Sequence, residues 1–481
     1  MSNQRLPKHF RLLGMSRVCF NGITLNSAMS HQLFALSPLD GRYKKQMGHL
    51  PVFFSEAGLM QYRLKVEIEY LIFLSEWKDI PHVKPFSQKL KDRLRKMYVD
   101  FGIHQAEAVK EIEQETNHDV KAIEYFLRDE LKSLSMFPES ALEFIHFCCT
   151  SEDINNLSYA LMVRDAVRKE YVVNVRTLLS TLQRLAKTWK GVSLLSMTHG
   201  QPATPTTVGK ELMVFIKRIE RQLEQVQGVH IMGKFSGATG NWNAHVVAYP
   251  DVDWKSFSKK FIKSLKLEPN LYTTQVESHD WNAELFDAMK RLNTVLLDLN
   301  RDMWMYISRG VFSQKVVAGE VGSSTMPHKV NPINFENSEG NLELANALFS
   351  RLSEKLPISR MQRDLSDSTV QRSMGTAFGY TALALQSLIK GLQKITLNKG
   401  KITAELDHNW EVLAEPVQTV MRMYGVKNAY EKLKELTRGK RVDAEAFHKF
   451  IDGLKIPAEA KSRLKALTPE NYVGLAEGLV G

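Results

Sequence analysis

The sequence is poor in cysteine, proline and glycine, and each shortage narrows the class of protein. Its 481 residues include only three cysteines, Cys19 and the adjacent pair Cys148 and Cys149. Three cysteines cannot build a disulfide framework, and no C-x-x-C pair suggests a metal knuckle, so we expect a reducing, cytoplasmic location. The 16 prolines and 27 glycines are both below average usage, which favours helix.

The chain also lacks any apolar run of the roughly 20 residues that a membrane span needs. The most apolar stretches, such as 70–74 and 381–388, are short and flanked by charge. A composition of 43% hydrophobic and 24% charged residues is ordinary for a globular protein and excludes disordered and low-complexity classes. We therefore expect a soluble protein without a membrane partner.

Basic residues exceed acidic ones, 64 to 53, which gives a formal net charge of +11. This excess suits nucleic acid, an anionic membrane or a small anionic substrate, and charge alone does not choose among them. The densest basic stretches, 255–266 and 432–441, are interleaved with acidic or core-spaced apolar residues, as on solvated helix faces. Because no zinc finger, RNP pattern or arginine-rich arm occurs, we expect no nucleic-acid partner.

The first 28 residues contain four basic residues, no acidic residue and no proper apolar core of a signal peptide. Met15 and Met29 offer internal starts, and organised sequence begins near Leu36. We interpret residues 1–35 as a leader that is disordered or an over-extended start; a targeting peptide is the weaker alternative.

Apolar residues recur at steps of three and four, which predicts long helices over 139–190, 208–226, 283–309, 334–355 and 373–395, although Gly340 and Gly375 interrupt the last two. Such helices cannot bury their apolar stripes within one small domain, so we expect an extended all-α bundle shared between subunits. Strand signals are limited to 246–249 and 272–276. Breakers suggest an N-terminal helical domain at 36–139, a central bundle at 140–392 and a C-terminal helical domain at 393–481.

The most concentrated polar signal is a loop at 319–332, Gly-Glu-Val-Gly-Ser-Ser-Thr-Met-Pro-His-Lys-Val-Asn-Pro, between two predicted long helices. Long loops within a bundle are usually functional. Ser323, Ser324, His328, Lys329 and Asn331 supply five polar groups within nine residues, which favours a site over an ordinary connection.

A second segment, 198–205, reads Thr-His-Gly-Gln-Pro-Ala-Thr-Pro. Thr204 followed by Pro205 predicts the N-cap and first residue of the next helix, which would place His199 on a rigid loop. A lone histidine is more often structural than catalytic, but the proline-braced loop favours a role in proton transfer.

Four further segments, 37–43, 116–119, 150–153 and 360–372, carry side chains suited to binding anions, although each alone is also compatible with a structural role. A glycine-rich stretch at 233–240 lacks the ending and the flanking strands of a phosphate loop, so we reject that interpretation. His146 with Cys148 and Cys149 also fails as a metal site, because residues two apart on a helix face away from each other.

These residues resemble the fumarase/aspartase superfamily, whose signature Gly-Ser-Ser-x-Met-Pro-x-Lys-x-Asn-Pro matches completely at 322–332. Within it, the segments at 117–119, 150–153, 198–205, 332–340 and 362–369 are similar to the bacterial-type branch of the adenylosuccinate lyase family. The resemblance covers residue 36 to the C-terminus. It implies a C–N lyase of purine nucleotide biosynthesis that eliminates fumarate from adenylosuccinate and from a succinylated aminoimidazole carboxamide ribotide (SAICAR).

The resemblance also implies roles for individual residues. Ser323 would be the general base and His199 the general acid, and no metal or organic cofactor would be needed. The residues that would bind the substrate are Arg42, Tyr43, Asn117, His118, Asp119, Thr150, Ser151, Gln275, Lys329, Asn331, Asn337, Arg363, Ser368, Thr369, Val370 and Arg372. His118 would either assist proton transfer or only bind.

The family fold implies a homotetramer in which three subunits contribute to each active site. Three alternatives stay open. One is the same reaction type on another substrate, namely elimination from argininosuccinate or aspartate, or the hydration of fumarate. The others are a catalytically inactive structural protein of the same superfamily and a nucleic-acid-binding protein. The phosphate-binding candidates Arg363 and Arg372 argue against the first, since those three substrates carry no phosphate.

Overall fold

The computed structural model describes residues 19–20, 23–24, 32–315, 325–326, 328–438 and 442–481. The chain divides into two compact units, Met1–Gly48 and His49–Gly481. In the first unit, the short strands β1 (Cys19–Phe20) and β2 (Ile23–Thr24) pair antiparallel. Residues 37–43 form a turn in which the Asp40 N–H donates to the Ser37 carbonyl at 3.2 Å.

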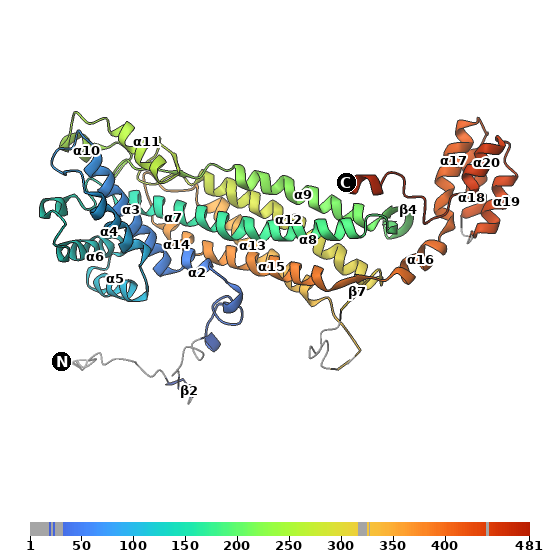
Figure 1. Cartoon of the computed structure of the whole chain (residues 1–481), viewed down its shortest axis with the longest axis horizontal. Coiled ribbons are helices and arrows are strands. Elements are labelled where there is room, and N and C mark those ends of the chain that lie inside the picture. Colours follow the sequence, from blue (N-terminus) through green and yellow to red (C-terminus); the bar gives the residue numbers. More distant parts are fainter. Residues whose placement is uncertain (1–18, 21–22, 25–31, 316–324, 327, 439–441) are drawn as a thin grey trace, which may run out of the picture. The chain divides into compact units, whose positions relative to one another are not determined.

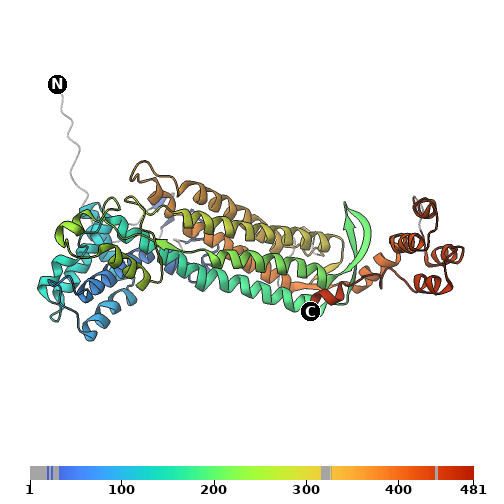
Figure 2. The same ribbon diagram turned by 90° about the horizontal axis from the view of Figure 1, so that it is seen from above.

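The second unit is built around long helices that run side by side (Figure 1, Figure 2). They are α7 (Ser151–Ala166), α8 (Val172–Thr188), α9 (Val208–Gly228), α12 (Asp280–Ser308), α13 (Ile333–Lys355) and α15 (Met374–Lys394). The helices predicted at 208–226, 283–309, 334–355 and 373–395 are thereby confirmed.

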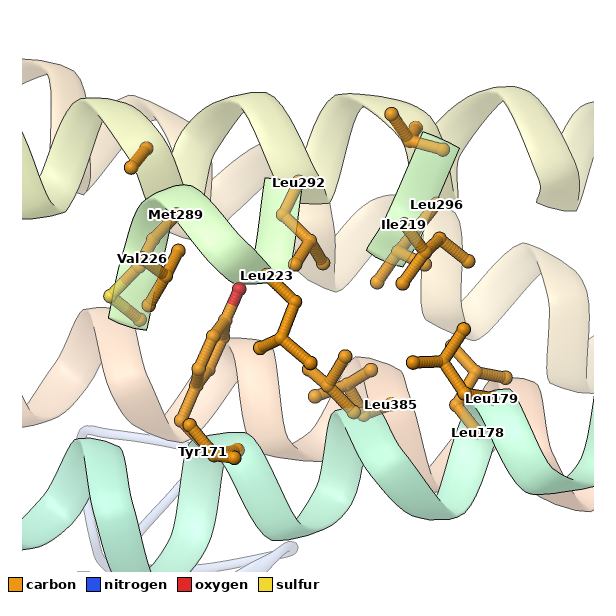
Figure 3. Packing of buried hydrophobic residues seen from close by; sticks show 14 of the residues in the cluster. Tyr171, Leu178, Leu179, Ile219, Leu223, Val226, Met289, Leu292, Leu296 and Leu385 are labelled. Atoms are coloured by element: carbon orange, nitrogen blue, oxygen red, sulfur yellow. The ribbon is translucent and has the colours of Figure 1, made fainter. Parts of the chain in front are cut away.

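The inner faces of α8, α9, α12 and α15 interlock around one apolar core (Figure 3). Fully buried examples are Leu178, Ile219, Leu292 and Leu296. Each such side chain contributes about 1.5–3 kcal/mol by leaving water. The three- and four-residue spacing in the sequence therefore has its cause in this shared core.

The single long helix predicted over 139–190 is wrong in its first part. Residues Glu139–Phe144 form a 3-10 helix, and α7 begins only at Ser151. Between them, His146 and Cys148 adopt the left-handed conformation with φ of 56° and 58°, which interrupts the helix without glycine or proline. A π-helical turn, Val167–Tyr171, then joins α7 to α8.

The prediction that Thr204 and Pro205 open a helix is also wrong. The segment forms a hairpin of β3 (Ser193–Thr198) and β4 (Gln201–Thr207), and Thr207 caps α9 by accepting from the Lys210 N–H at 3.2 Å. Pro202 and Pro205 are tolerated because the sheet has only two strands, so both strands are edges.

The two short strands predicted from the sequence are not observed. Residues 246–248 belong to α10 (Asn243–Ala248), and 272–276 forms bends. Short pairs instead join β5 (Met232–Gly233) to β6 (Glu268–Pro269), and β7 (Phe312–Gln314) to β8 (Ile395–Leu397). The helix α11 (Trp254–Ser264) precedes β6.

The short helix α2 (Leu50–Phe54) packs its buried Leu50 and Phe53 into the bundle core. A second apolar core lies among α3 (Glu56–Glu76), α4 (Gln88–Val99), α5 (Ile103–Thr116) and α6 (Asp119–Ser133). Helix α3 serves both cores, because Leu64 and Ile68 pack into this one while Val66 and Tyr70 pack into the bundle core. Helix α3 thereby ties the early helices to the bundle.

After α15 the chain continues as α16 (Lys399–Asp407), α17 (Ala414–Met423), α18 (Ala429–Thr437), α19 (Ala444–Asp452) and α20 (Ala458–Lys465). The domain boundaries at 139 and 392 stay predictions. None of the helices in the described part of the chain combines the length and the hydropathy that a bilayer span requires.

Candidate active site

A cavity of about 460 Å³ opens where α6, α7 and the short helix α14 (Ser366–Gln371) begin. Its lining brings together ten of the substrate-binding residues predicted from the sequence. They are Asn117, His118, Asp119, Thr150, Ser151, Gln275, Arg363, Ser368, Thr369 and Arg372. These residues come from four separate stretches of the chain, so their convergence is a property of the fold.

The Asn117–Asp119 corner is shaped by the ends of two helices. Asn117 ends α5 in the left-handed conformation, with φ of 50°, and His118 is the N-cap of α6. The His118 Nδ1 accepts from the Lys121 N–H at 3.1 Å, so in the neutral ring Nε2 carries the hydrogen. Exposed and lining the cavity, His118 presents that Nε2 as a donor.

Asp119 lies between two arginines. Its Oδ2 accepts from Arg63 Nη2 at 2.7 Å and from Arg372 Nη2 at 3.0 Å. Burial alone would raise the pKa of Asp119, but Arg63 and Arg372 outweigh burial and hold that pKa below its usual value. Two guanidiniums against one carboxylate leave a net positive charge at this wall of the cavity.

The start of α7 is fixed by a fully buried ion pair. Asp153 accepts from the Thr150 N–H at 2.9 Å, and its Oδ1 lies 2.9 Å from Lys234 Nζ, with both side chains fully buried. The Ser236 N–H adds a third donor at 2.9 Å. Thr150 and Ser151 are thus held at the helix N-terminus, where free N–H groups and the helix dipole favour an anion.

Another part of the cavity wall is held by Arg363. Its Nη1 donates to Glu152 Oε2 at 2.6 Å, and its Nη2 donates to Ser368 Oγ at 3.3 Å. Burial raises the pKa of Glu152, and Arg363 offsets part of that shift. Thr369 is exposed beside Ser368 and lines the cavity, whereas Val370 is half-buried against the bundle core.

The other predicted site residues lie elsewhere. Asn337 sits on α13, where its Oδ1 accepts from Ser387 Oγ at 2.6 Å. Lys329 is exposed and Asn331 half-buried in the segment before α13. Arg42 and Tyr43 belong to the first compact unit, where the guanidinium lies 5.7 Å from the ring centroid.

Of the two predicted catalytic residues, the structure describes only His199, and His199 does not line this cavity. Ser323 lies outside the described residues. His199 is exposed at the tip of the β3–β4 hairpin, and the nearly continuous helix from Ser151 to Thr188 separates that hairpin from the cavity. At about 1.5 Å per residue this helix spans roughly 55 Å. The strands of the hairpin, six and seven residues long, reach only about 23 Å.

Sequence reasoning missed several wall residues. Arg63 is 3% exposed and also donates from Nε to Asn155 Oδ1 at 2.8 Å. A usable signal was present, because Arg63 stands between Met60 and Leu64 on the apolar face of α3. Tyr159 and Glu113 also line the cavity, and no pattern in the sequence singled them out.

Glu152, His279 and Asp367 form a buried cluster next to Arg363, with one ligand atom from each residue within 4.8 Å of the others. In the described part of the chain, this is the group whose donor atoms are close enough to hold a metal ion.

A larger cavity of about 610 Å³ borders α8 and α9. Its lining includes the basic residues Arg168, Arg176 and Lys266, but none of the residues predicted from the sequence to bind substrate. We therefore place the site at the smaller cavity, where those residues converge.

Comparisons with known proteins cover almost the whole chain. The family model "Lyase" matches residues 41–345, and the model "Adenylosuccinate lyase C-terminal" matches residues 359–473. Proteins named adenylosuccinate lyase are 54% identical in Vibrio cholerae (92% of this chain, 97% of the relative), 53% in Escherichia coli K12 and 52% in Haemophilus influenzae (each 93% of this chain, 98% of the relative).

Solved structures share the fold at low identity. A 3-carboxy-cis,cis-muconate lactonizing enzyme from Pseudomonas putida has a TM-score of 0.71 at 19% identity, covering 90% of this chain and 95% of that one. A fumarate lyase from Mesorhizobium has a TM-score of 0.70 at 17% identity, covering 91% and 96%. Given the family models and the identities above 50%, this chain belongs to the adenylosuccinate lyase family of the fumarase/aspartase superfamily.

Proposed function

We propose that the protein is an adenylosuccinate lyase, which eliminates fumarate from adenylosuccinate to give AMP and from SAICAR to give the free carboxamide ribotide. The observation that carries the proposal is the cavity where three guanidiniums, those of Arg63, Arg363 and Arg372, lie beside the N-termini of α6 and α7. Both substrates carry a phosphate and two carboxylates. Guanidiniums and helix N-termini are the groups that complement such anions.

The reaction breaks a C–N bond and forms the C=C bond of fumarate. A base removes the proton from the carbon next to a carboxylate, and an acid protonates the departing nitrogen. In our proposal Ser323 is the base and His199 is the acid. A serine hydroxyl is a weak base at its free pKa, so positive charge and exclusion of water must stabilise its alkoxide. Lys329 and Asn331 follow it closely in sequence and are proposed to contribute.

The remaining assignments divide the substrate into two ends. Arg42, Tyr43, Arg363, Ser368 and Arg372 are proposed to bind phosphate and ribose, with Thr369 and Val370 completing that side. The heterocyclic base and the succinyl carboxylates of the substrate are proposed to be bound by Asn117, His118, Asp119, Thr150, Ser151, Gln275, Lys329 and Asn337.

The separation between His199 and the cavity supports a site shared between copies. Roughly 55 Å of helix lies between Thr150 and the β3–β4 hairpin, so one chain does not bring His199 to its own cavity. We propose a homotetramer in which His199 and Ser323 reach the cavity of other subunits. Within each subunit, we propose that 36–139, 140–392 and 393–481 are three helical domains.

The test is an absorbance assay of the purified protein with adenylosuccinate, run beside argininosuccinate, with Ser323→Ala as the control. We expect loss of adenylosuccinate with release of AMP and fumarate by the unsubstituted protein, and none by the variant. Turnover of argininosuccinate instead, or no turnover by an intact oligomer, would overturn the proposal.

A further inference from the structure

Three helices begin at one buried point beside the cavity. Glu152 comes from the first turn of α7, Asp367 from the first turn of α14, and His279 is the N-cap of α12. These three residues are only 2–3% exposed. Glu152 Oε1, His279 Nε2 and Asp367 Oδ2 are all buried without a hydrogen-bond partner, although ligand atoms of the three residues lie within 4.8 Å of one another. Unsatisfied buried polar atoms are costly, so something must compensate them.

The surroundings of the His279 ring favour its doubly protonated form. Nε2 lies 3.7 Å from Asp367 Oδ2, and Nδ1 lies 3.2 Å from Asn282 Oδ1. Both nitrogens therefore face oxygen acceptors, and only the imidazolium has a hydrogen on each. A proton on Nε2 places a positive charge 3.7 Å from Asp367 Oδ2, so that the two carboxylates are compensated by charge attraction rather than by a hydrogen bond.

The charges that face this ring come from every element packed around it. Asp367 and Glu152 approach from α14 and α7, and Glu277 accepts from the His279 N–H at 2.8 Å. Arg363 is the other cation, and it contacts Glu152. Burial by itself would lower the pKa of His279, but Asp367, Glu277 and Glu152 outweigh burial and raise that pKa. Burial by itself would raise the pKa of Asp367, but His279, the Ser368 N–H and Arg363 together outweigh burial and lower that pKa.

We infer that His279 is a positioning residue whose imidazolium compensates the Glu152 and Asp367 carboxylates and so keeps Arg363 directed at the anionic end of the substrate. With His279 charged, Arg363 gives Nη1 to Glu152 and keeps Nη2 on Ser368 at the cavity wall. Without that charge, both carboxylates compete for Arg363. The inference rests on the proposed function only where it names the substrate. The positioning of Arg363 by His279 applies to any phosphorylated ligand that binds in the cavity.

The first test compares His279→Gln with His279→Arg. The neutral glutamine should raise KM for adenylosuccinate by about 10-fold or more while kcat changes little, because the change weakens substrate binding and leaves the proton-transfer groups in place. The arginine, which keeps the positive charge, should recover most of that loss. The exposed His104, whose side chain is 90% accessible, gives the matched control His104→Gln.

The pH profile separates charge from mere packing. A raised pKa means that the imidazolium is present at low pH and is lost as pH rises through that pKa. The KM of the unsubstituted protein should therefore rise on the alkaline side, and His279→Arg should lack this rise. Titration of the substrate phosphate is common to both proteins and cancels in the comparison.

A double substitution keeps the inference testable even where His279→Gln folds poorly. Asp367→Asn removes the carboxylate that His279 faces, so adding it to His279→Gln should recover part of the stability and of the KM. A KM for His279→Gln equal to that of the unsubstituted protein, or no recovery in His279→Arg, would overturn the inference. So would a stoichiometric divalent metal whose chelation reproduces the His279→Gln phenotype.

Binding of AMP and of inorganic phosphate by calorimetry supplies a readout that needs no turnover. Weaker binding in His279→Gln and recovery in His279→Arg would support the inference even for a protein that does not cleave adenylosuccinate. Failure of the proposed function would show as absent turnover in the unsubstituted protein. Failure of the inference would show as equal binding in all three proteins.

Discussion

The cavity and the β3–β4 hairpin differ in how firmly they are held. At the cavity, Asp119, Asp153 and Glu152 each pair with a lysine or an arginine at 3.0 Å or less. At the hairpin tip, His199 is exposed, with φ of 54°, on a two-stranded ribbon. The groups that we propose to bind the charged substrate are therefore preorganised within one chain. His199, which we propose to serve the cavity of another copy, instead stands on an extended hairpin.

The largest expected effect comes from the residues proposed for proton transfer. Ser323→Ala and His199→Gln should each lower turnover by about 10²–10⁴-fold and leave the oligomer intact. Steady-state assays with light scattering of the oligomer would measure both. Near-normal turnover in either variant would remove that residue from its proposed role.

Mixing these two inactive variants tests whether the β3–β4 hairpin of one copy serves the cavity of another. If it does, subunit exchange should create some sites with both groups intact and restore part of the activity. No recovery despite proven exchange would mean that each chain completes its own site.

The next largest effect is expected on stability, at the start of α7 beside the cavity. Lys234→Met removes the buried partner of Asp153 and should lower the free energy of unfolding by about 3–5 kcal/mol, because a carboxylate is left without its cation in the interior. Urea unfolding would measure it, with the exposed Lys187→Met as the matched control. A loss below about 1 kcal/mol would show that the backbone donors alone stabilise Asp153.

A smaller effect is expected at the cavity wall. Arg372→Gln should raise KM for adenylosuccinate by about 10–100-fold with a lesser change in kcat, since a charged hydrogen bond to the substrate contributes about 1.5–3 kcal/mol. The exposed Arg93→Gln serves as the control. An unchanged KM would mean that Arg372 pairs with Asp119 but does not bind the substrate.

The smallest effect is expected at the hairpin tip. Gly200 has φ of +73°, and no atom lies within 4 Å of the position that a Cβ would take there. Gly200→Ala therefore strains the backbone by about 1 kcal/mol without a clash. We expect turnover to fall by no more than about tenfold. Gly228→Ala, also in open space but without a positive φ, should be neutral. A loss as large as that of His199→Gln would show that the turn itself fixes the reacting geometry.

The fold was largely predictable from the sequence, because apolar periodicity reports burial directly. Helices α9, α12, α13 and α15 follow it to within a few residues. The hairpin was not predictable, since prolines at 202 and 205 argue against a strand unless both strands are edges. The break at 145–150 was missed because non-glycine residues there adopt the left-handed conformation.

The candidate site was predictable where one short segment supplies several polar side chains. Asn117, Thr150 and Arg372 were found in this way. Arg63 and His279 were missed, because the carboxylates of Asp119 and Asp367 that they face lie more than 50 residues away in sequence. Pairing across that distance is set by the packing of helices, which local patterns do not encode.

The π-helical turn at Val167–Tyr171 has a consequence for how this chain tolerates changes of length. A π turn holds one residue more than the α-helical turn it replaces, so it absorbs an extra residue locally. Removing one residue within this turn should leave a regular helix, with Leu178 and Leu182 still facing their core. Removing one residue from the regular part of α8 instead rotates everything after it by about 100°. The longest helical stretch of the bundle therefore contains one short segment where its length can change without loss of register.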